Sequence, residues 1–209
     1  MTVLVTGFEP FDGESINPSE RVAQAVAGRT VAGARVSGDV LPCVFGKSAD
    51  RLADAITRLN PAVVICLGQA GGRRGIQLER VALNLADARI PDNEGNQPVN
   101  QRIETAGPVA YWSGLPLVAM EKELSGAGLP VAFSLSAGAF VCNHLFYSLM
   151  HRLTHAGISS IRAGFIHLPW LPEQAGALRG EPSLSLEKQI TAVEILIESA
   201  LKSLGSTAA

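Results

Sequence analysis

The sequence has few aromatic residues, few charged residues and no long apolar run. Aromatic residues make up 5% of the 209 residues and charged residues 17%, and the formal net charge is −2. Without a basic excess there is no field to attract nucleic acid. The longest apolar runs, such as residues 62–67, fall far short of the roughly 20 residues that a membrane-spanning helix needs. We therefore expect neither a nucleic-acid-binding protein nor a membrane protein.

Cysteine is also scarce, with Cys43, Cys66 and Cys142 as the three present. An odd and sparse set is typical of a reducing compartment and does not suggest a disulfide framework. The first residues have no basic segment and run directly into a strand pattern, so we expect no signal peptide. Together these features predict a cytoplasmic protein.

Apolar residues make up 47% of the chain, which excludes global disorder. Residues 1–209 are most simply one domain, long enough to bury a sizeable core. Hydrophobic periodicity predicts helices over residues 19–27, 47–59 and 115–124, from 141 onward, and after a capping Ser185. Strands are expected at residues 3–6, 35–41, 62–67, 77–85, 130–135 and 161–166. This alternation predicts an α/β fold, with helices on both sides of a mostly parallel, twisted sheet. Residues 89–108 form a long polar loop, which hints at function or mobility.

Cys142 lies where a strand passes into a helix. Backbone N–H groups in a first helical turn are unpaired, and the helix dipole is positive there. Such a position stabilises a thiolate, and the same amides can hold an oxyanion. The alternative is a small buried hydrophobe. A nucleophile would need a base and an orienting acid elsewhere in the chain.

His167 and Glu79 are the candidates for these two roles. His167 follows the strand after the Cys142 helix, and its imidazole can reach the sulfur if the strands on either side of that helix are neighbours. The alternative is a structural histidine. Glu79 is flanked by apolar residues near a glycine-rich loop and can orient the imidazole. The alternative for Glu79 is a surface pair with Arg80.

Metal and nucleotide signatures fail. His151 and His155 have the spacing of a two-histidine site, but no glutamate stands between them. The segment 46–48 resembles the end of a P-loop, but Leu41 occupies the position of its first glycine. The glycines of residues 68–75 lack dinucleotide-binding spacing and are expected to form a turn.

Several longer motifs resemble the pyroglutamyl peptidase I family: TGFEPF at 6–11, GQAGGR at 68–73, VCNH at 141–144 and GFIH at 164–167. Shorter matches lie at residues 17–18, 79–82, 88–93, 136–138 and 171–174, so the likeness covers nearly the whole chain. The resemblance implies a cytosolic cysteine peptidase with a three-layer α/β/α sandwich. It also implies a homotetramer without cofactor or metal, which removes N-terminal pyroglutamyl residues from peptides.

The resemblance assigns roles to individual residues. It makes Cys142 the nucleophile that forms a thioester, His167 the base and acid, and Glu79 the residue that orients His167. The positions that it implies for substrate binding are Phe8, Phe11, Asn17, Gln69, Arg89, Ile90, Phe140 and Val141. Departures from the family pattern at Leu135, Ser136 and Trp170 leave the three catalytic positions unchanged. Two other functions stay open, a general amidase with the same triad and a non-catalytic small-molecule binding protein.

Overall fold

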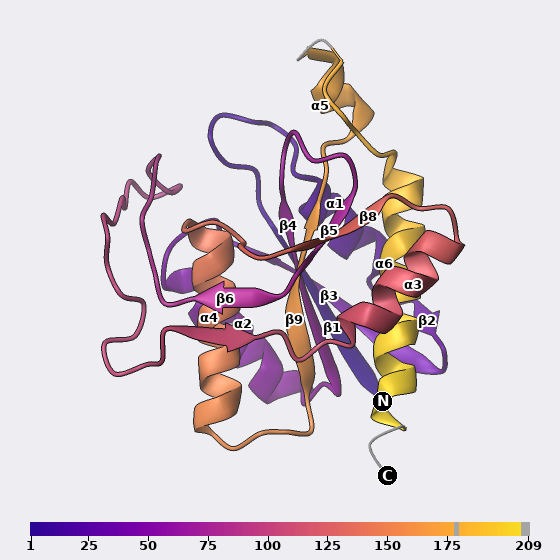
Figure 1. The fold of residues 1–209 in the computed structure, drawn as a ribbon, viewed down its shortest axis with the longest axis horizontal. Helices are drawn as coiled ribbons and strands as arrows, with labels where there is room; N and C mark the ends of the chain where they lie inside the picture. Colours follow the sequence, from indigo (N-terminus) through magenta and orange to yellow (C-terminus); the bar gives the residue numbers. More distant parts are fainter. Residues whose placement is uncertain (178–179, 206–209) are drawn as a thin grey trace.

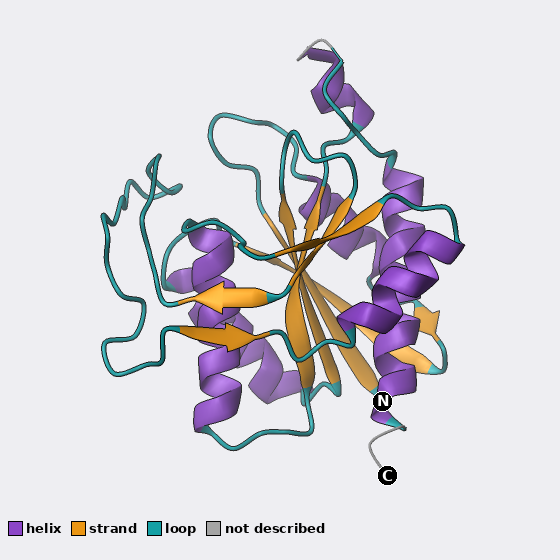
Figure 2. Ribbon diagram, viewed as in Figure 1, coloured by secondary structure: helices purple, strands orange, loops and turns teal. Residues whose placement is uncertain are grey.

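A computed structural model of the protein describes residues 1–177 and 180–205. Its centre is a seven-stranded sheet with the strand order β2-β3-β1-β4-β9-β5-β8 (Figures 1 and 2). The strands of this sheet are β1 (Thr2–Phe8), β2 (Thr30–Val31), β3 (Ala34–Leu41), β4 (Val63–Gln69), β5 (Ile76–Glu79), β8 (Val131–Ser134) and β9 (Arg162–Leu168). Strands β3, β1, β4 and β9 are parallel to one another, whereas β2 is antiparallel to β3 and β5 is antiparallel to β9.

Helices cover both faces of the sheet, because the strand residues alternate between two apolar clusters. In β1, Val3 and Val5 join the cluster that includes α1 (Pro18–Val26), α3 (Leu117–Gly126) and α6 (Leu186–Leu204). Leu4 and Phe8 join the opposite cluster, which includes α2 (Lys47–Leu59) and α4 (Val141–His155). Each such side chain contributes about 1.5–3 kcal/mol when it is fully buried. The expected three-layer α/β/α sandwich with a mostly parallel sheet is confirmed.

The expected strand at residues 77–85 is wrong in one respect, because the chain leaves the large sheet after Glu79. Residues 76–79 form β5, whereas β6 (Val81–Leu83) pairs with β7 (Ala110–Trp112) in a separate two-stranded sheet. At the break, the Arg80 guanidinium lies 4.0 Å from the centroid of the Phe133 ring. This cation–π contact holds Arg80 away from Glu79.

The two strands that flank α4 are not neighbours, contrary to the condition set for contact between Cys142 and His167. Strand β5 lies between β8 and β9 and is antiparallel to β9. Chain order does not reveal such an insertion, since it depends on pairing between distant segments. The inserted strand carries Glu79 and brings this carboxylate next to β9.

The sequence patterns did not predict three short elements. These are the edge strand β2, strand β7 and the helix α5 (Pro172–Ala177). Two or three residues cannot show a period, so β2 and β7 gave no signal. No helix within residues 1–177 and 180–205 combines the length and the apolar character that crossing a membrane requires.

The long loop 89–108 is fastened by two buried side chains. The Asn84 amide oxygen accepts hydrogen bonds from the N–H groups of Ile103 and Glu104, at 2.8 and 2.9 Å. The Asp92 carboxylate accepts from the N–H groups of Phe45 and Asn96, at 2.9 and 2.8 Å. The loop therefore has a defined path beside the start of α4.

Asn17 caps α1 and is buried. Its Oδ1 accepts from the N–H and the hydroxyl of Ser19, at 3.0 and 2.7 Å, and its Nδ2 donates to the Glu9 carbonyl at 3.1 Å. All of these bonds stay within the chain, so Asn17 fixes the loop 9–17 to the helix.

We expect Asn17→Ala to lower the free energy of unfolding by about 1–2 kcal/mol, since a buried cap and its partners lose their bonds. Urea denaturation measures this change. Ser185→Ala is the matched control, because Ser185 caps α6 through one longer bond of 3.4 Å to the Lys188 N–H and should cost less. Unchanged stability of Asn17→Ala would contradict the capping role.

Candidate active site

Cys142 is the second residue of α4, which follows the extended N-cap residue Phe140. Its backbone N–H belongs to the first turn, where helical N–H groups lack partners within the helix. Burial raises the pKa of the Cys142 thiol well above its ordinary value, and the nearby thiols and the Glu79 carboxylate raise it further. The N–H of Cys142 acts in the opposite direction but does not prevail. The contributions that raise the pKa oppose the thiolate stabilisation that the position at the helix start led us to expect.

The Cys142 sulfur lies against the sheet, over Gly68 of β4. A Cβ atom placed on Gly68 would be 2.9 Å from Sγ. In the sheet, Gly68 is the Cα partner of His167 on the neighbouring parallel strand β9. Paired residues project their side chains from the same face. The helix thus delivers the sulfur to the strand position next to His167.

His167 and Glu79 form a buried hydrogen-bonded pair. Nδ1 of His167 lies 2.8 Å from Oε1 of Glu79, and the two residues are 6% and 2% exposed. A carboxylate only accepts hydrogen bonds, so Nδ1 carries a proton and donates it. In the neutral ring, Nε2 is then left unprotonated and able to accept a proton.

Glu79 has no other ionic or hydrogen-bond partner among the residues that the structure describes. Its second oxygen, Oε2, is buried without a hydrogen bond, and Arg80 stacks on Phe133 instead. A surface pair with Arg80 is therefore the wrong interpretation of Glu79. A buried, half-satisfied carboxylate costs stability, and such groups are typical of functional sites.

Four of the eight expected substrate-binding residues line one cavity of about 210 Å³ beside the start of α4. They are Phe11, Arg89, Ile90 and Phe140. The rings of Phe11 and Phe140 have centroids 5.9 Å apart and form an apolar wall.

Sequence reasoning missed Asp87 and Ala139, which also line this cavity. They are joined by a hydrogen bond of 2.9 Å from the Asp87 N–H to the Ala139 carbonyl. Their adjacency to the motifs at residues 88–93 and 141–144 was the available signal.

The other four expected substrate-binding residues do not line this cavity. Phe8 and Val141 are buried in the cluster beneath α4, and Asn17 caps α1. Gln69 donates to Glu14 at 3.1 Å and accepts from Gln174 at 2.9 Å. The Gln69 side chain therefore connects the loop after β1 to α5.

Asn143 is a further residue that sequence reasoning passed over. It is fully buried, and its Oδ1 accepts from the Leu83 N–H at 2.9 Å. Its Nδ2 donates to the carbonyls of Leu83 and Leu85, both at 2.9 Å. These three bonds fasten the first turn of α4 to β6. Its place directly after Cys142 in a family motif was the available signal.

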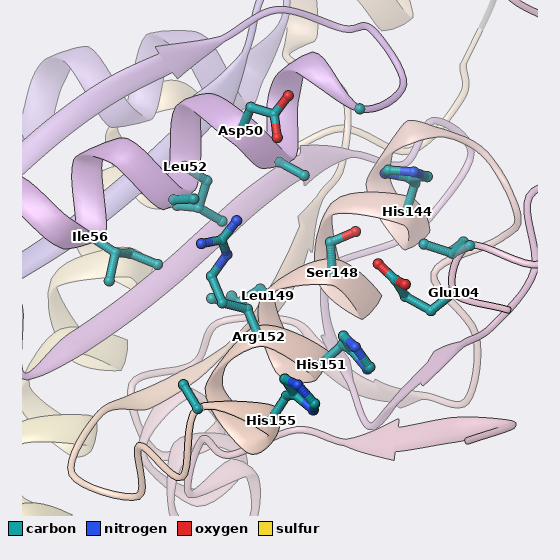
Figure 3. Close-up of a pocket in the computed structure, with 15 residues that line it drawn as sticks. Asp50, Leu52, Ile56, Glu104, His144, Ser148, Leu149, His151, Arg152 and His155 are labelled. Atoms are coloured by element: carbon teal, nitrogen blue, oxygen red, sulfur yellow. The ribbon is translucent and has the colours of Figure 1, made fainter. Parts of the chain in front are cut away.

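A larger cavity of about 490 Å³ lies between α2 and α4, and Figure 3 shows its histidines and the carboxylates of Asp50 and Glu104. Cys142, His167 and Glu79 are not among its lining residues. His151 Nδ1 is 2.9 Å from the Tyr111 hydroxyl, and the rings of His151 and His155 stack with centroids 5.7 Å apart. Within residues 1–177 and 180–205, no group of three or more His, Cys, Asp or Glu side chains is placed to hold a metal ion.

Comparison with known proteins agrees with this geometry. A profile of the pyroglutamyl peptidase family matches residues 1–203. Pyrrolidone-carboxylate peptidase from Bacillus cytotoxicus is 51% identical over 201 residues, which cover 96% of this chain and 93% of that protein. Pyrrolidone-carboxylate peptidase 2 from Photorhabdus laumondii is 52% identical over 201 residues, covering 96% of this chain and 92% of its own length.

Solved structures show the same relationship. Pyroglutamyl peptidase I from Bacillus amyloliquefaciens superposes with a TM-score of 0.93 at 46% identity, covering 96% of this chain and 97% of that one. A mutant pyrrolidone carboxyl peptidase from Pyrococcus furiosus gives a TM-score of 0.93 at 42% identity, covering 98% and 100% of the two chains. The chain therefore belongs to the pyroglutamyl peptidase family and is a hydrolase of the cysteine-peptidase type.

Proposed function

We propose that the protein hydrolyses the bond after an N-terminal pyroglutamyl residue of a peptide, through Cys142, His167 and Glu79 and a thioester intermediate. The observation that carries the proposal is the buried contact of 2.8 Å between His167 Nδ1 and Glu79 Oε1. His167 is paired in the sheet with Gly68, and the Cys142 sulfur lies over Gly68. The names of the relatives supply the substrate class, and the geometry supplies the chemistry.

The reaction begins with transfer of the thiol proton. Because burial raises the pKa of the Cys142 thiol, a base has to take up its proton before the sulfur can act as a thiolate nucleophile. Nε2 of His167 accepts this proton, and the Glu79 carboxylate stabilises the imidazolium that forms. The thiolate then bonds to the pyroglutamyl carbonyl carbon, and the π electrons of that carbonyl move to its oxygen.

The resulting oxyanion needs hydrogen-bond donors at the start of α4. The backbone N–H of Cys142 is one donor, and the positive end of the helix dipole adds to it. Arg89 lines the adjacent cavity and supplies the second donor in this proposal. His167 returns the proton to the leaving amine, the carbon–nitrogen bond breaks, and a thioester remains. Water, deprotonated by His167, then attacks the thioester carbon. The carbon–sulfur bond breaks, His167 returns the proton to the Cys142 sulfur, and pyroglutamate leaves.

The cavity of about 210 Å³ suits the pyroglutamyl ring, which is a small neutral lactam. The rings of Phe11 and Phe140 and the side chain of Ile90 offer apolar contact, and Asp87 and Arg89 offer polar contact. Because the side chains of Asn17 and Gln69 form hydrogen bonds to other residues of the chain, we propose that they shape the loops around the site. Phe8 and Val141 support the floor beneath α4.

Assembly into a homotetramer and the absence of a cofactor stay predictions that rest on the family resemblance. The cytoplasmic location also stays a prediction, which rests on the sparse cysteines and the N-terminal pattern as well. None of the proposed catalytic steps requires a second subunit, because Cys142, His167 and Glu79 all come from one chain.

We expect Cys142→Ala to lower release of a pyroglutamyl-amide reporter by at least about 10³-fold, because the nucleophile is removed. A fluorogenic assay measures this loss. Cys43→Ala is the matched control and should keep turnover, since Cys43 is buried in the apolar cluster beneath α4 and has no part in the proposed steps. Retained turnover in Cys142→Ala would end the assignment. Equal turnover of substrates with N-terminal Glu, Gln or Pro would support a general amidase instead.

We expect Glu79→Gln to lower kcat by roughly 10²–10³-fold without lowering stability. The glutamine amide is neutral and cannot stabilise the imidazolium, so kcat should fall. The substitution also removes a buried negative charge from a carboxylate whose Oε2 has no hydrogen-bond partner, so stability should not fall. Steady-state kinetics and thermal unfolding measure the two effects. Glu194→Gln, at an exposed pair with Arg29, is the control for carboxylate removal. Wild-type kcat in Glu79→Gln would remove Glu79 from the mechanism.

The raised pKa of the Cys142 thiol sets the pH dependence of its alkylation. Below that pKa, the thiolate fraction and the rate with iodoacetamide should grow about tenfold per pH unit. We therefore expect the rate to rise steadily from pH 6 to pH 9, followed by mass spectrometry of the Cys142 peptide. An alkylation rate that is constant from pH 6 to pH 8 would show that the thiolate is already formed at pH 6, which would contradict the raised pKa of the Cys142 thiol.

A further inference from the structure

Gly68 is a buried strand residue whose lack of a side chain is not explained by backbone conformation. It lies near the end of β4 and is absent from the glycines with positive φ. Any residue could adopt such a strand conformation. The reason for glycine at this position must therefore be space.

The side-chain volume of position 68 is filled by two other residues. A Cβ atom on Gly68 would lie 2.9 Å from Cys142 Sγ and 2.8 Å from Cζ of Phe165. Such separations are well inside van der Waals contact, so an added methyl group forces one neighbour to move. The Cys142 sulfur thus occupies the space beside the sheet that the missing side chain of Gly68 leaves open.

His167 and Phe165 border the space that the Cys142 sulfur occupies. Gly68 is paired with His167, so the imidazole stands at the adjacent strand position on the same face. Phe165 forms the floor, with its ring centroid 4.9 Å from that of His167. The ring of Phe165 is itself held between Phe8 and Phe146, at centroid distances of 6.4 and 6.0 Å. The sulfur is therefore the neighbour with more freedom to move.

We propose that Gly68 is a positioning residue, which sets the Cys142 sulfur beside the His167 imidazole by leaving its own side-chain space to that sulfur. The expected change in kcat rests on the proposed function, whereas the expected displacement of the sulfur rests on the packing alone. A methyl group at position 68 displaces the sulfur from the imidazole, and a displacement of about 1 Å can cost 10²-fold in rate. The substrate cavity does not include Gly68, so substrate binding should be spared.

The first test is Gly68→Ala in the full-length enzyme, assayed with a pyroglutamyl-amide reporter. We expect kcat to fall by roughly 10²-fold while KM stays within about threefold, because the sulfur moves and the ring cavity does not. Gly164→Ala is the matched control. A Cβ on Gly164 would lie 2.8 Å from Leu115 Cδ1 and would meet Ser113 Oγ still more closely, so this site is at least as crowded. Gly164 faces the opposite cluster, and its variant should change stability far more than kcat.

The second test is independent of substrate and works even where Gly68→Ala folds poorly. The urea midpoint is measured for Gly68→Ala in the wild-type background and in a Cys142→Ala background, as a double-mutant cycle. Removing the sulfur takes away one of the two side chains that meet the added methyl group, so the shift caused by Gly68→Ala should be clearly smaller when Cys142 is absent.

The outcomes separate this inference from the proposed function. A kcat within about threefold of wild type in Gly68→Ala, or the same midpoint shift in both backgrounds, overturns the positioning role. Failure of both Gly68→Ala variants to fold also overturns it, since Phe165 alone would then account for the crowding. If the wild-type enzyme fails to release pyroglutamate while the cycle shows coupling, the proposed function falls and the packing role of Gly68 stands.

Discussion

The site depends on one buried hydrogen bond, which runs from His167 Nδ1 to Glu79 Oε1 over 2.8 Å. The sheet is arranged around it, because β5 enters between β9 and β8 in the reverse direction and carries the carboxylate to the imidazole. The break after Glu79 then matters, since it sends Arg80 to Phe133 and leaves Glu79 without a cation. A carboxylate held in this way has His167 as its one described partner, and so it fixes both the orientation and the protonated nitrogen of that ring.

The thiol reaches this pair by the docking of α4. Asn143 fastens the first turn of the helix to β6 through three hydrogen bonds, and Gly68 leaves the space that the sulfur fills. Burial raises the pKa of the Cys142 thiol, so the proposed mechanism needs a base to take up its proton. The cavity of about 210 Å³ lies beside the same helix turn and is lined by Phe11 and Phe140. In the proposed function, the nucleophile, the base and the ring-binding cavity therefore meet where one helix end lies against two strands.

Much of this architecture could be predicted from the sequence. Apolar periodicity located the major strands and helices, because burial on one face is a local signal. Glu79 was a candidate partner of His167 from its apolar flanks, and the family motifs strengthened that expectation, although the two residues are 88 positions apart. The order of β8, β5 and β9 was not predicted, because strand pairing depends on distant segments. Asn17 and Gln69 were expected to bind substrate through the family resemblance, and their partners Ser19, Glu14 and Gln174 become visible only in three dimensions. The raised pKa of the Cys142 thiol was likewise not predicted, since the helix dipole can be inferred locally but the extent of burial cannot.

The central claim is that Glu79 selects the His167 tautomer that leaves Nε2 free to take the Cys142 proton. The most direct measurement is ¹⁵N NMR of the enzyme labelled at histidine, with His167→Gln used to assign the resonances. The account predicts that the neutral His167 ring carries its proton on Nδ1, with a strongly hydrogen-bonded proton signal that disappears in Glu79→Gln. A neutral ring protonated on Nε2, or an Nδ1 signal that is unchanged in Glu79→Gln, would contradict it.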